Sequence, residues 1–237
     1  MSWISSLLRR NPALDTAQLA RLEQCRRMPA VSLDLPFGAQ RVLVVDVESS
    51  GLDPYADRLL SIGAIDVSAG VIRLDSAFEV LLRQEWASAD ENILVHHIGG
   101  SAQLAGRERA DGLLDFLCVS GKAPLVAFHV DFDRVLIERT VKAVLGIRPE
   151  NSWLDLALLA PALFPKHAAT ARVLDDWLRV FGIENHARHN ALADALATAQ
   201  LLLAVLAAAK GCGLATWADL ARLQKDQRWL AESGRIV

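Results

Sequence analysis

Apolar residues follow two spacings along this chain. Short apolar runs bounded by turn residues are typical of strands, and apolar residues every three or four positions are typical of helices. The predicted strands are 41–47, the two halves of 58–83 on either side of a turn at 68–70, 124–128 and a brief stretch after Ser152. The predicted helices are 1 to about 30, 102–119, 131–145 ended by Gly146, a segment bounded by Pro165, 170–181, 190–209 and 214–232. Strands that come first and then alternate with helices predict an α/β sheet with helices packed on it.

Two stretches have neither spacing. Residues 29–40 are rich in turn formers and are interpreted as a linker, and 85–100 are predicted to be irregular. The predicted organisation is therefore a helical N-terminal extension and linker over 1–39, a central α/β domain over 40–210, and a helical C-terminal extension over 211–237.

The first predicted strand ends in two acids. Asp46 and Glu48 follow the apolar run 42–45, and the chain then breaks at Ser49, Ser50 and Gly51. Side chains two residues apart in a strand point to the same face, so the two carboxylates are neighbours. Two such groups repel each other unless a positive charge lies between them. A solvent-exposed strand end or a turn is the ordinary alternative.

Another acidic pair follows the strand at 124–128. Asp131 is placed to cap the helix that begins there, which is a common role for an aspartate. Asp133 lies two residues further on and is able to face back over the end of the sheet. The alternative is a plain acid in the first helical turn, favoured by the helix dipole.

The third point is the stretch "RHNALADALATA". Asp194 is a lone charge among alanines and leucines, so a buried position would require a partner or a metal ion. Five residues turn a helix through about 500°, so His189 and Asp194 do not share one helical face. His189 is therefore expected in the loop before the helix, free to swing, which suits a general base.

Carboxylates without thiolates or clustered histidines favour Mg²⁺ or Mn²⁺ over zinc. Two such ions about 4 Å apart can activate water and stabilise the leaving oxygen of a phosphoryl displacement. The residues therefore point to phosphodiester hydrolysis.

In order and spacing these residues resemble the DnaQ-like (DEDD) superfamily of 3′–5′ exonucleases, in its histidine-bearing DEDDh branch, which includes the proofreading subunits of bacterial replicative polymerases. "VVDVESSGLDP" is similar to the first family motif, "VAFHVDFDRVLI" to the second and "RHNALADALATAQLL" to the third. "LVHHI" and "WLDLALLAPALFP" resemble connecting segments of the family, and the resemblance covers about 40–209. It implies a ribonuclease H-like fold with a mixed five-stranded sheet flanked by helices.

The resemblance also implies a role for each matching residue. The metal-binding carboxylates would be Asp46, Glu48, Asp133 and Asp194, holding two Mg²⁺ or Mn²⁺ ions, and His189 would be the general base. The terminal nucleotide would be held by Ser49, Ser50, Gly51, Leu52, His96 and His129, with Leu52 as an apolar wedge against the base.

The chain departs from the family pattern at a few positions. Two serines replace the usual threonines after Glu48 and keep their hydroxyls. Phe128 and His129 replace a His-Asn pair, which puts the substrate contact there in doubt, and His97 replaces a glycine. Tyr55, the one tyrosine of the chain, is far from Asp194 in sequence, which excludes the tyrosine-bearing branch.

Charge, cysteine content and apolar stretches limit the possible ligands and cellular compartment of the protein. A net charge of −3 shows no basic excess for nucleic acid, but bound metal ions would supply positive charge. Cys25, Cys118 and Cys212 are odd in number and far apart, so they support neither a disulfide framework nor a zinc knuckle, and a reducing cytoplasm fits best. The apolar stretch 195–209 is too short for a bilayer, and the N-terminus does not read as a signal peptide. No membrane association is expected.

Three functions remain open from sequence. The first is an exonuclease on single-stranded 3′ ends of DNA, free-standing or as a polymerase accessory. The second keeps the chemistry but acts on short RNA or RNA 3′ ends. The third is an inactive binding module, which would predict decay among the acids. The segment "SLDLPF" loosely resembles peptides that bind sliding clamps, and a linker explains it equally well.

Overall fold

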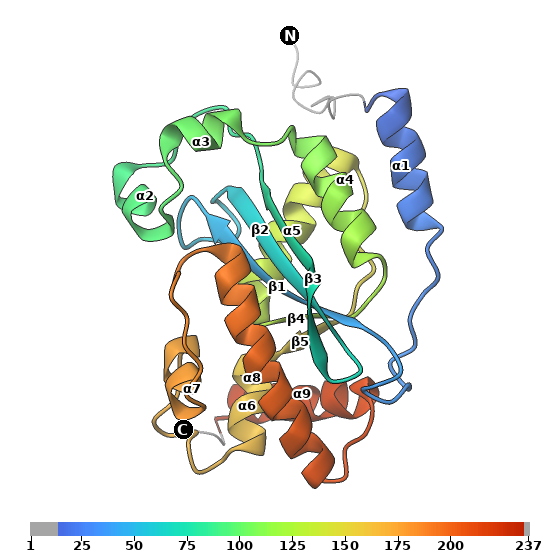
Figure 1. The fold of residues 1–237 in the computed structure, drawn as a ribbon, viewed down its shortest axis with the longest axis vertical. Coiled ribbons are helices and arrows are strands. Elements are labelled where there is room, and N and C mark those ends of the chain that lie inside the picture. Colours follow the sequence, from blue (N-terminus) through green and yellow to red (C-terminus); the bar gives the residue numbers. More distant parts are fainter. Residues whose placement is uncertain (1–13, 235–237) are drawn as a thin grey trace.

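A five-stranded mixed sheet lies at the centre of the computed structural model, which describes residues 14–234 (Figure 1). The strands are β1 (Val42–Ser49), β2 (Leu59–Ser68), β3 (Val71–Leu81), β4 (Leu125–Ala127) and β5 (Trp153–Asp155). Their order is β3-β2-β1-β4-β5, with β1–β2 and β2–β3 antiparallel and β1–β4 and β4–β5 parallel. The predicted mixed five-stranded sheet is confirmed.

Helices cover both faces of this sheet. They are α1 (Thr16–Arg26), α2 (Asp90–His96), α3 (Gly100–Ala105), α4 (Arg109–Ser120), α5 (Val130–Leu145), α6 (Leu156–Leu163), α7 (Leu174–Val180), α8 (Ala191–Gly211) and α9 (Trp217–Glu232). One apolar core joins the sheet to α6, α7, α8 and α9, and the other joins it to α1, α4 and α5.

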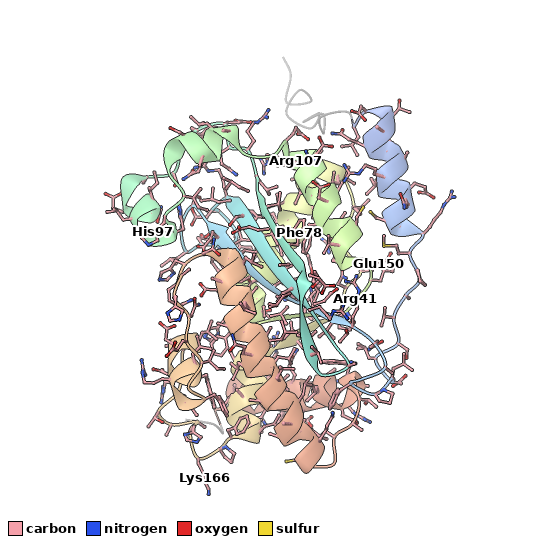
Figure 2. All side chains as sticks on the ribbon, viewed as in Figure 1. Arg41, Phe78, His97, Arg107, Glu150 and Lys166 are labelled. Carbon is pink, nitrogen blue, oxygen red and sulfur yellow. The ribbon has the colours of Figure 1, made fainter. Side chains whose placement is uncertain are left out.

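The central strand β1 feeds both cores by its period of two. Val42 and Val44 face the core with α8, whereas Leu43, Val45 and Val47 face the core with α4 and α5. A run buried on both faces explains why 42–45 reads as continuously apolar. Arg41 marks one end of this strand and His97, beside α2, lies at the opposite side of the molecule (Figure 2).

The prediction that 85–100 is irregular is wrong for 90–96, which form a helix. The region contains α2 and the start of α3, and the C-cap of α2 is His97, whose φ of 56° is left-handed. A helix of 7 residues makes about two turns, so it is too short to show a clear helical period. Such pieces are ordered by their contacts with the rest of the fold rather than by local propensity.

The predicted helix 102–119 is interrupted. The backbone N–H of Arg107 donates to Leu81 O over 2.7 Å, and Arg83 N–H donates to Arg107 O over 2.7 Å. Gly106 permits this approach, since a Cβ there would lie 2.8 Å from the Leu82 carbonyl carbon. The break therefore follows from pairing with the end of β3, a contact that local sequence does not show. The predicted helix 170–181 is also shorter in the structure, where α7 spans Leu174–Val180.

The two extensions pack on the sheet domain. Asp15 caps α1 in a capping box, so the helix begins at Thr16; the first 13 positions of the predicted N-terminal helix, with Trp3, lie outside the described residues. The C-terminal helix α9 packs on α6 and β5, and Gln224 Oε1 accepts from Asp155 N–H over 2.6 Å. Gly146 ends α5 in a left-handed conformation, as predicted.

The segment "SLDLPF" is part of this packing. Phe37 is buried with its ring 5.1 Å from that of Trp217, and Phe37 N–H donates to Ala215 O over 3.1 Å. Ala218 N–H donates to Leu33 O over 2.8 Å. The segment thus joins the linker to the start of α9, and clamp binding would require it to leave this position.

Helix α8 is the core helix of the larger apolar cluster. Within residues 14–234 it is the one helix long and apolar enough to span a bilayer, but 56% of its most apolar window is buried against the rest of the protein. Core helices of globular proteins commonly meet the same criterion, so this is weak evidence for a membrane span.

Candidate active site

The end of β1 and the start of α8 bring three carboxylates together. Asp46 pairs with Gly63 and Glu48 with Ser61 across β2, which places both acids on the face covered by α8. Oxygen atoms of Asp46, Glu48 and Asp194 all lie within 4.8 Å of one another. The prediction that Asp46 and Glu48 share a face is confirmed. Asp194, which lies 146 positions after Glu48 in the chain, is brought next to them by the fold.

Gly63 makes this approach possible. A Cβ at Gly63 would lie 2.2 Å from both the Ala191 carbonyl carbon and the Leu192 nitrogen. The first turn of α8 therefore rests directly on the β2 backbone opposite Asp46. Sequence reasoning missed this residue, although a glycine inside an apolar strand signals the close approach of another backbone.

Gly63→Ala is expected to destabilise the protein by about 3 kcal/mol, because the new methyl must displace a helix backbone rather than a flexible side chain. Chemical denaturation measures this loss. Gly211→Ala is the matched control at the other end of α8, where nothing lies within 4 Å of the new Cβ. Equal midpoints for Gly63→Ala and the wild type would show that the α8 approach is not tight.

The fourth predicted carboxylate is buried as well, but it stands apart from the other three. Asp133, in the first turn of α5, is 5% exposed, and its charge acts on Asp46. It is not one of the three residues whose oxygens meet within 4.8 Å. Asp131 does not cap α5, so that prediction is wrong: the N-cap is His129, and Asp131 pairs with Arg134 at 2.7 Å and Arg228 at 3.5 Å.

Burial and the crowding of these acids raise the pKa values of Asp46, Glu48 and Asp133. Burial, and then the charges of Asp133 and Asp194, raise the pKa of Asp46 well above its usual range. Burial and the Asp194 charge raise the pKa of Glu48 to about 7. Burial likewise raises the pKa of Asp133. A cation among these oxygens would relieve both the desolvation and the repulsion, so the residues fit a hard divalent metal ion.

Asp194 has protein partners that the sequence did not reveal. Arg188 Nη1 and Asn185 Nδ2 both donate to Asp194 Oδ1, and His189 N–H donates to Asp194 Oδ2 over 3.0 Å. Arg188 also pairs through Nε with Asp175 Oδ1 at 2.7 Å. The partner predicted for this buried charge is therefore the guanidinium of Arg188, from the preceding loop. This single positive charge is smaller than the total negative charge of the acidic cluster.

His189 lies in the loop before α8, as predicted. Its φ is 62°, and the hydrogen bond from its N–H to Asp194 holds its backbone, so the expectation of a freely swinging residue is wrong for the main chain. The residue contributes to a cavity of about 360 Å³ beside the acids. This cavity is lined by Glu48, Ser61, Glu79, Leu81, His96, Ile98, His189, Asn190 and Ala191.

Glu79 is a further acid of this cavity that sequence reasoning missed. It pairs with Gly63 across β3 and β2, in line with Asp46, and its Oε1 accepts from Asn190 Nδ2 over 2.9 Å. Asn190 is also the N-cap of α8. The Glu79–Asn190 hydrogen bond therefore ties the start of α8 to the outer strand.

The turn after β1 is rigidly built. Ser49 Oγ donates to Gly51 O over 2.5 Å, and Ser50 Oγ donates to Asp57 Oδ1 over 3.0 Å. Both hydroxyls thus hold the turn itself. Leu52 is 92% exposed at its tip, which suits an apolar wedge. Arg139 of α5 donates to backbone carbonyls of this turn, and Asn92 of α2 donates to Ser50 O.

The two predicted substrate histidines differ in position. His96 is buried in the cavity wall, where Nδ1 accepts from Ile98 N–H over 3.0 Å and burial lowers the pKa of the ring. His129 is exposed, does not line the cavity, and donates through its backbone N–H to Asp155 Oδ1 over 3.0 Å. His97, His129 and His189 are three of the four non-glycine residues with positive φ in the described part of the chain. Such conformations are often found at functional sites.

Comparison with known proteins shows which family has this sequence pattern. The chain matches the profile of the exonuclease family RNase T, described as "Exonuclease", over residues 43–202. This chain belongs to that exonuclease family. The match includes all the acids of the cluster and His189, so the resemblance seen in the motifs is confirmed and the protein is placed among the nuclease hydrolases.

Named relatives of this exonuclease-family chain are polymerase proteins. It is 25% identical over 194 residues to a PolC-type DNA polymerase III of Thermotoga maritima, covering 82% of this chain and 14% of that one. It is 29% identical over 203 residues to a DNA polymerase III subunit epsilon-like protein of Rhodobacter capsulatus, covering 84% and 28%. The chain thus spans less than a third of either relative.

The fold is shared with solved exonucleases. The structure of E. coli exonuclease I in complex with a dT13 oligonucleotide has a TM-score of 0.63 and 18% identity, covering 73% of this chain and 42% of that one. The expected ribonuclease H-like fold is therefore confirmed. The cytoplasmic setting stays a prediction.

Proposed function

We propose that this chain is a metal-dependent 3′–5′ exonuclease that hydrolyses phosphodiester bonds at the 3′ ends of DNA, in a proofreading or repair-like role. The observation that carries the proposal is the meeting of Asp46, Glu48 and Asp194 beside an open cavity, in a chain of the exonuclease family. An inactive binding module would not require buried acids that raise one another's pKa.

In this proposal Asp46, Glu48, Asp133 and Asp194 would hold two Mg²⁺ or Mn²⁺ ions. The donor set supports this, since it consists of hard carboxylate oxygens with an excess of negative charge over the one guanidinium of Arg188. Such ions supply positive charge to the attacking and leaving oxygens of an in-line displacement.

His189 would act as the general base. His189 lines the cavity together with Glu48, which brings the residue beside the acidic cluster. The left-handed backbone of His189 and the hydrogen bond from its N–H to Asp194 fix the position of the main chain from which the side chain extends. An unprotonated ring nitrogen there takes a proton from the attacking water.

The terminal nucleotide would lie between the β1 turn and the cavity. Leu52 offers an apolar surface to a base, while Gly51 and the backbone that Ser49 and Ser50 hold approach the sugar. His96 would contact the nucleotide from the cavity wall. His129 is exposed outside the cavity lining and would meet the strand beyond the terminal nucleotide.

DNA is favoured as substrate because the relatives are DNA polymerase III proteins and the neighbour of known structure is bound to dT13. Association with a DNA polymerase follows from the same relatives, whereas "SLDLPF" does not support a sliding-clamp contact. RNA 3′ ends are the alternative substrate, since no described contact distinguishes the two sugars.

The experiment incubates the full chain with 3′- or 5′-labelled single-stranded DNA, mismatched duplex DNA and short RNA, in Mg²⁺, Mn²⁺ or EDTA. We expect release of labelled mononucleotides from 3′-labelled DNA, a ladder of shortened products from 5′-labelled DNA, and neither in EDTA. Folded protein that releases nothing from any 3′ end in either metal would contradict the proposal. Faster release from RNA than from DNA would select the alternative substrate.

A further inference from the structure

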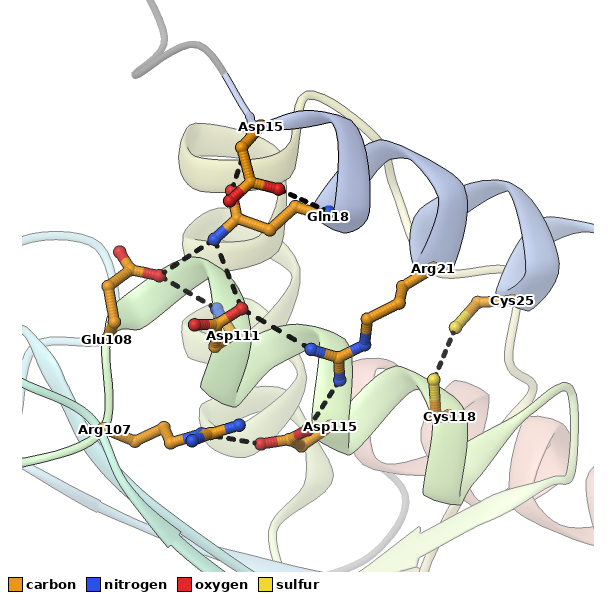
Figure 3. Close-up of polar contacts among 9 residues, drawn as sticks. All are labelled: Asp15, Gln18, Arg21, Cys25, Arg107, Glu108, Asp111, Asp115 and Cys118. Carbon is orange, nitrogen blue, oxygen red and sulfur yellow. Dashed lines mark hydrogen bonds and ion pairs between the residues drawn. The ribbon is translucent and has the colours of Figure 1, made fainter.

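The N-terminal helix α1 lies along α4 and makes several polar contacts with it (Figure 3). Arg21 Nη2 pairs with Asp115 Oδ1 at 2.6 Å, and Gln18 Nε2 donates to Asp111 Oδ1 over 3.2 Å. The arginine and both aspartates keep about a third of their side-chain surface exposed. Partly exposed pairs of this kind contribute little each, about 0–1 kcal/mol.

The apolar part of the same contact is small. Leu22 and Cys25 are the buried residues of α1. An element held by so little buried area is expected to open more readily than the core helices. The state of any covalent link between α1 and α4 would therefore decide how firmly α1 stays attached.

Two thiols face each other at one end of this contact. Cys25 Sγ of α1 and Cys118 Sγ of α4 are 3.0 Å apart, although 93 residues separate them in the chain (Figure 3). A disulfide bond of about 2.05 Å would require the sulfurs to close by about 1 Å. Cys25 is buried and Cys118 is half-buried, and Cys212 is exposed on a different element. Sequence spacing alone supports no disulfide framework, because it does not show that these two cysteines meet.

We propose that Cys25 and Cys118 are a thiol oxidation site, which closes to an intramolecular disulfide and fastens α1 to α4 when a small-molecule disulfide is the oxidant. The more exposed Cys118 thiol loses its proton, and its sulfur attacks one sulfur of the oxidant, releasing a first small thiolate. Cys25 then loses its proton and attacks Cys118 Sγ, releasing the second. Two protein thiols and one small disulfide thus become one protein disulfide and two small thiols.

The environment assigns this order. Cys118 is half-buried whereas Cys25 is buried, so a small oxidant in solution reaches the Cys118 sulfur first. Burial, together with the Cys118 contact, raises the pKa of the Cys25 thiol to about 12. Cys118 is therefore the better first nucleophile, and Cys25 is placed to resolve the mixed disulfide.

Oxidation is tested on the full chain in glutathione buffers of increasing disulfide-to-thiol ratio. We expect mass spectrometry to find a Cys25–Cys118 cross-link, and the thermal midpoint to rise by about 5–10 °C, reversibly with dithiothreitol. Limited trypsin digestion in the linker after Arg27 should release an α1 peptide from the reduced protein only.

Matched variants separate this from unspecific oxidation. Cys25→Ser and Cys118→Ser should each lose the cross-link and the rise in midpoint, while Cys212→Ser should keep both. Glutathione fixed on Cys118 without a cross-link, or disulfides formed only through Cys212, would overturn the proposal. The cross-link is measured on wild-type protein, so poor folding of a serine variant does not affect that result, and neither measurement depends on nuclease activity.

Discussion

Asp194→Asn is expected to abolish nucleotide release while leaving the fold intact. The amide has nearly the volume of the carboxylate. With its oxygen at the Oδ1 position it still accepts from Arg188 and Asn185, whereas the nitrogen at the Oδ2 position no longer accepts from His189 N–H, so the loop before α8 keeps two of its three hydrogen bonds to this side chain. The cluster with Asp46 and Glu48 loses one of its three negative charges. Losing a charged group from the site should lower kcat by on the order of 10²–10³-fold or more.

The measurement is single-turnover release from 3′-labelled DNA, with Mn²⁺ affinity from calorimetry as a second readout. Both should fall in Asp194→Asn. Asp175→Asn is the matched control, because Asp175 shares the Arg188 guanidinium but lies outside the carboxylate cluster. If Asp175→Asn lost as much activity, the pairing of Arg188 rather than charge at Asp194 would be the essential feature.

His189→Asn is expected to lower kcat by about 10²–10⁴-fold, the range for loss of a general base. Asparagine tolerates the left-handed φ of 62° better than most residues, and the substitution keeps the N–H that donates to Asp194. Metal affinity should therefore stay within about threefold of the wild type, since the ring is removed but the ligands are not.

Stopped-flow release from labelled DNA and Mn²⁺ calorimetry, on the same preparations, separate the two effects. His186→Asn changes an exposed histidine of the same loop and should leave both unchanged. A loss of rate matched by an equal loss of metal affinity would contradict the base assignment. His189 would then be a residue that holds Asp194 in position rather than the general base.

The parts of the site that could be predicted are those that depend on local spacing. Asp46 and Glu48 share a face because β1 is a strand, and Gly146 ends α5 because glycine adopts a left-handed φ readily. Placing His189 before α8 needed only the pitch of a helix. The family motifs then connected these points in order, and the profile match confirmed that connection.

The predictions that failed concern specific contacts that sequence spacing does not show. The break at Gly106 follows from hydrogen bonds to the end of β3. Asp131 lies in the first turn of α5, but it pairs with Arg134 of the same helix and with Arg228 of α9, while His129 is the N-cap. The backbone of His189 is held by Asp194, five residues further along the chain. In each case a contact made in the folded protein replaced the preference that the sequence indicated.

The sequence by itself determined the strands and the longer helices of the domain, the order of its acids and its membership of a nuclease family. Only the tertiary structure decided that α8 rests on Gly63, that Arg188 reaches Asp194, and that Cys25 meets Cys118. Periodicity is a property of neighbouring residues, so it can be read from the chain. Contacts between distant residues depend on how whole elements pack, and that is set by the complete core rather than by any one segment.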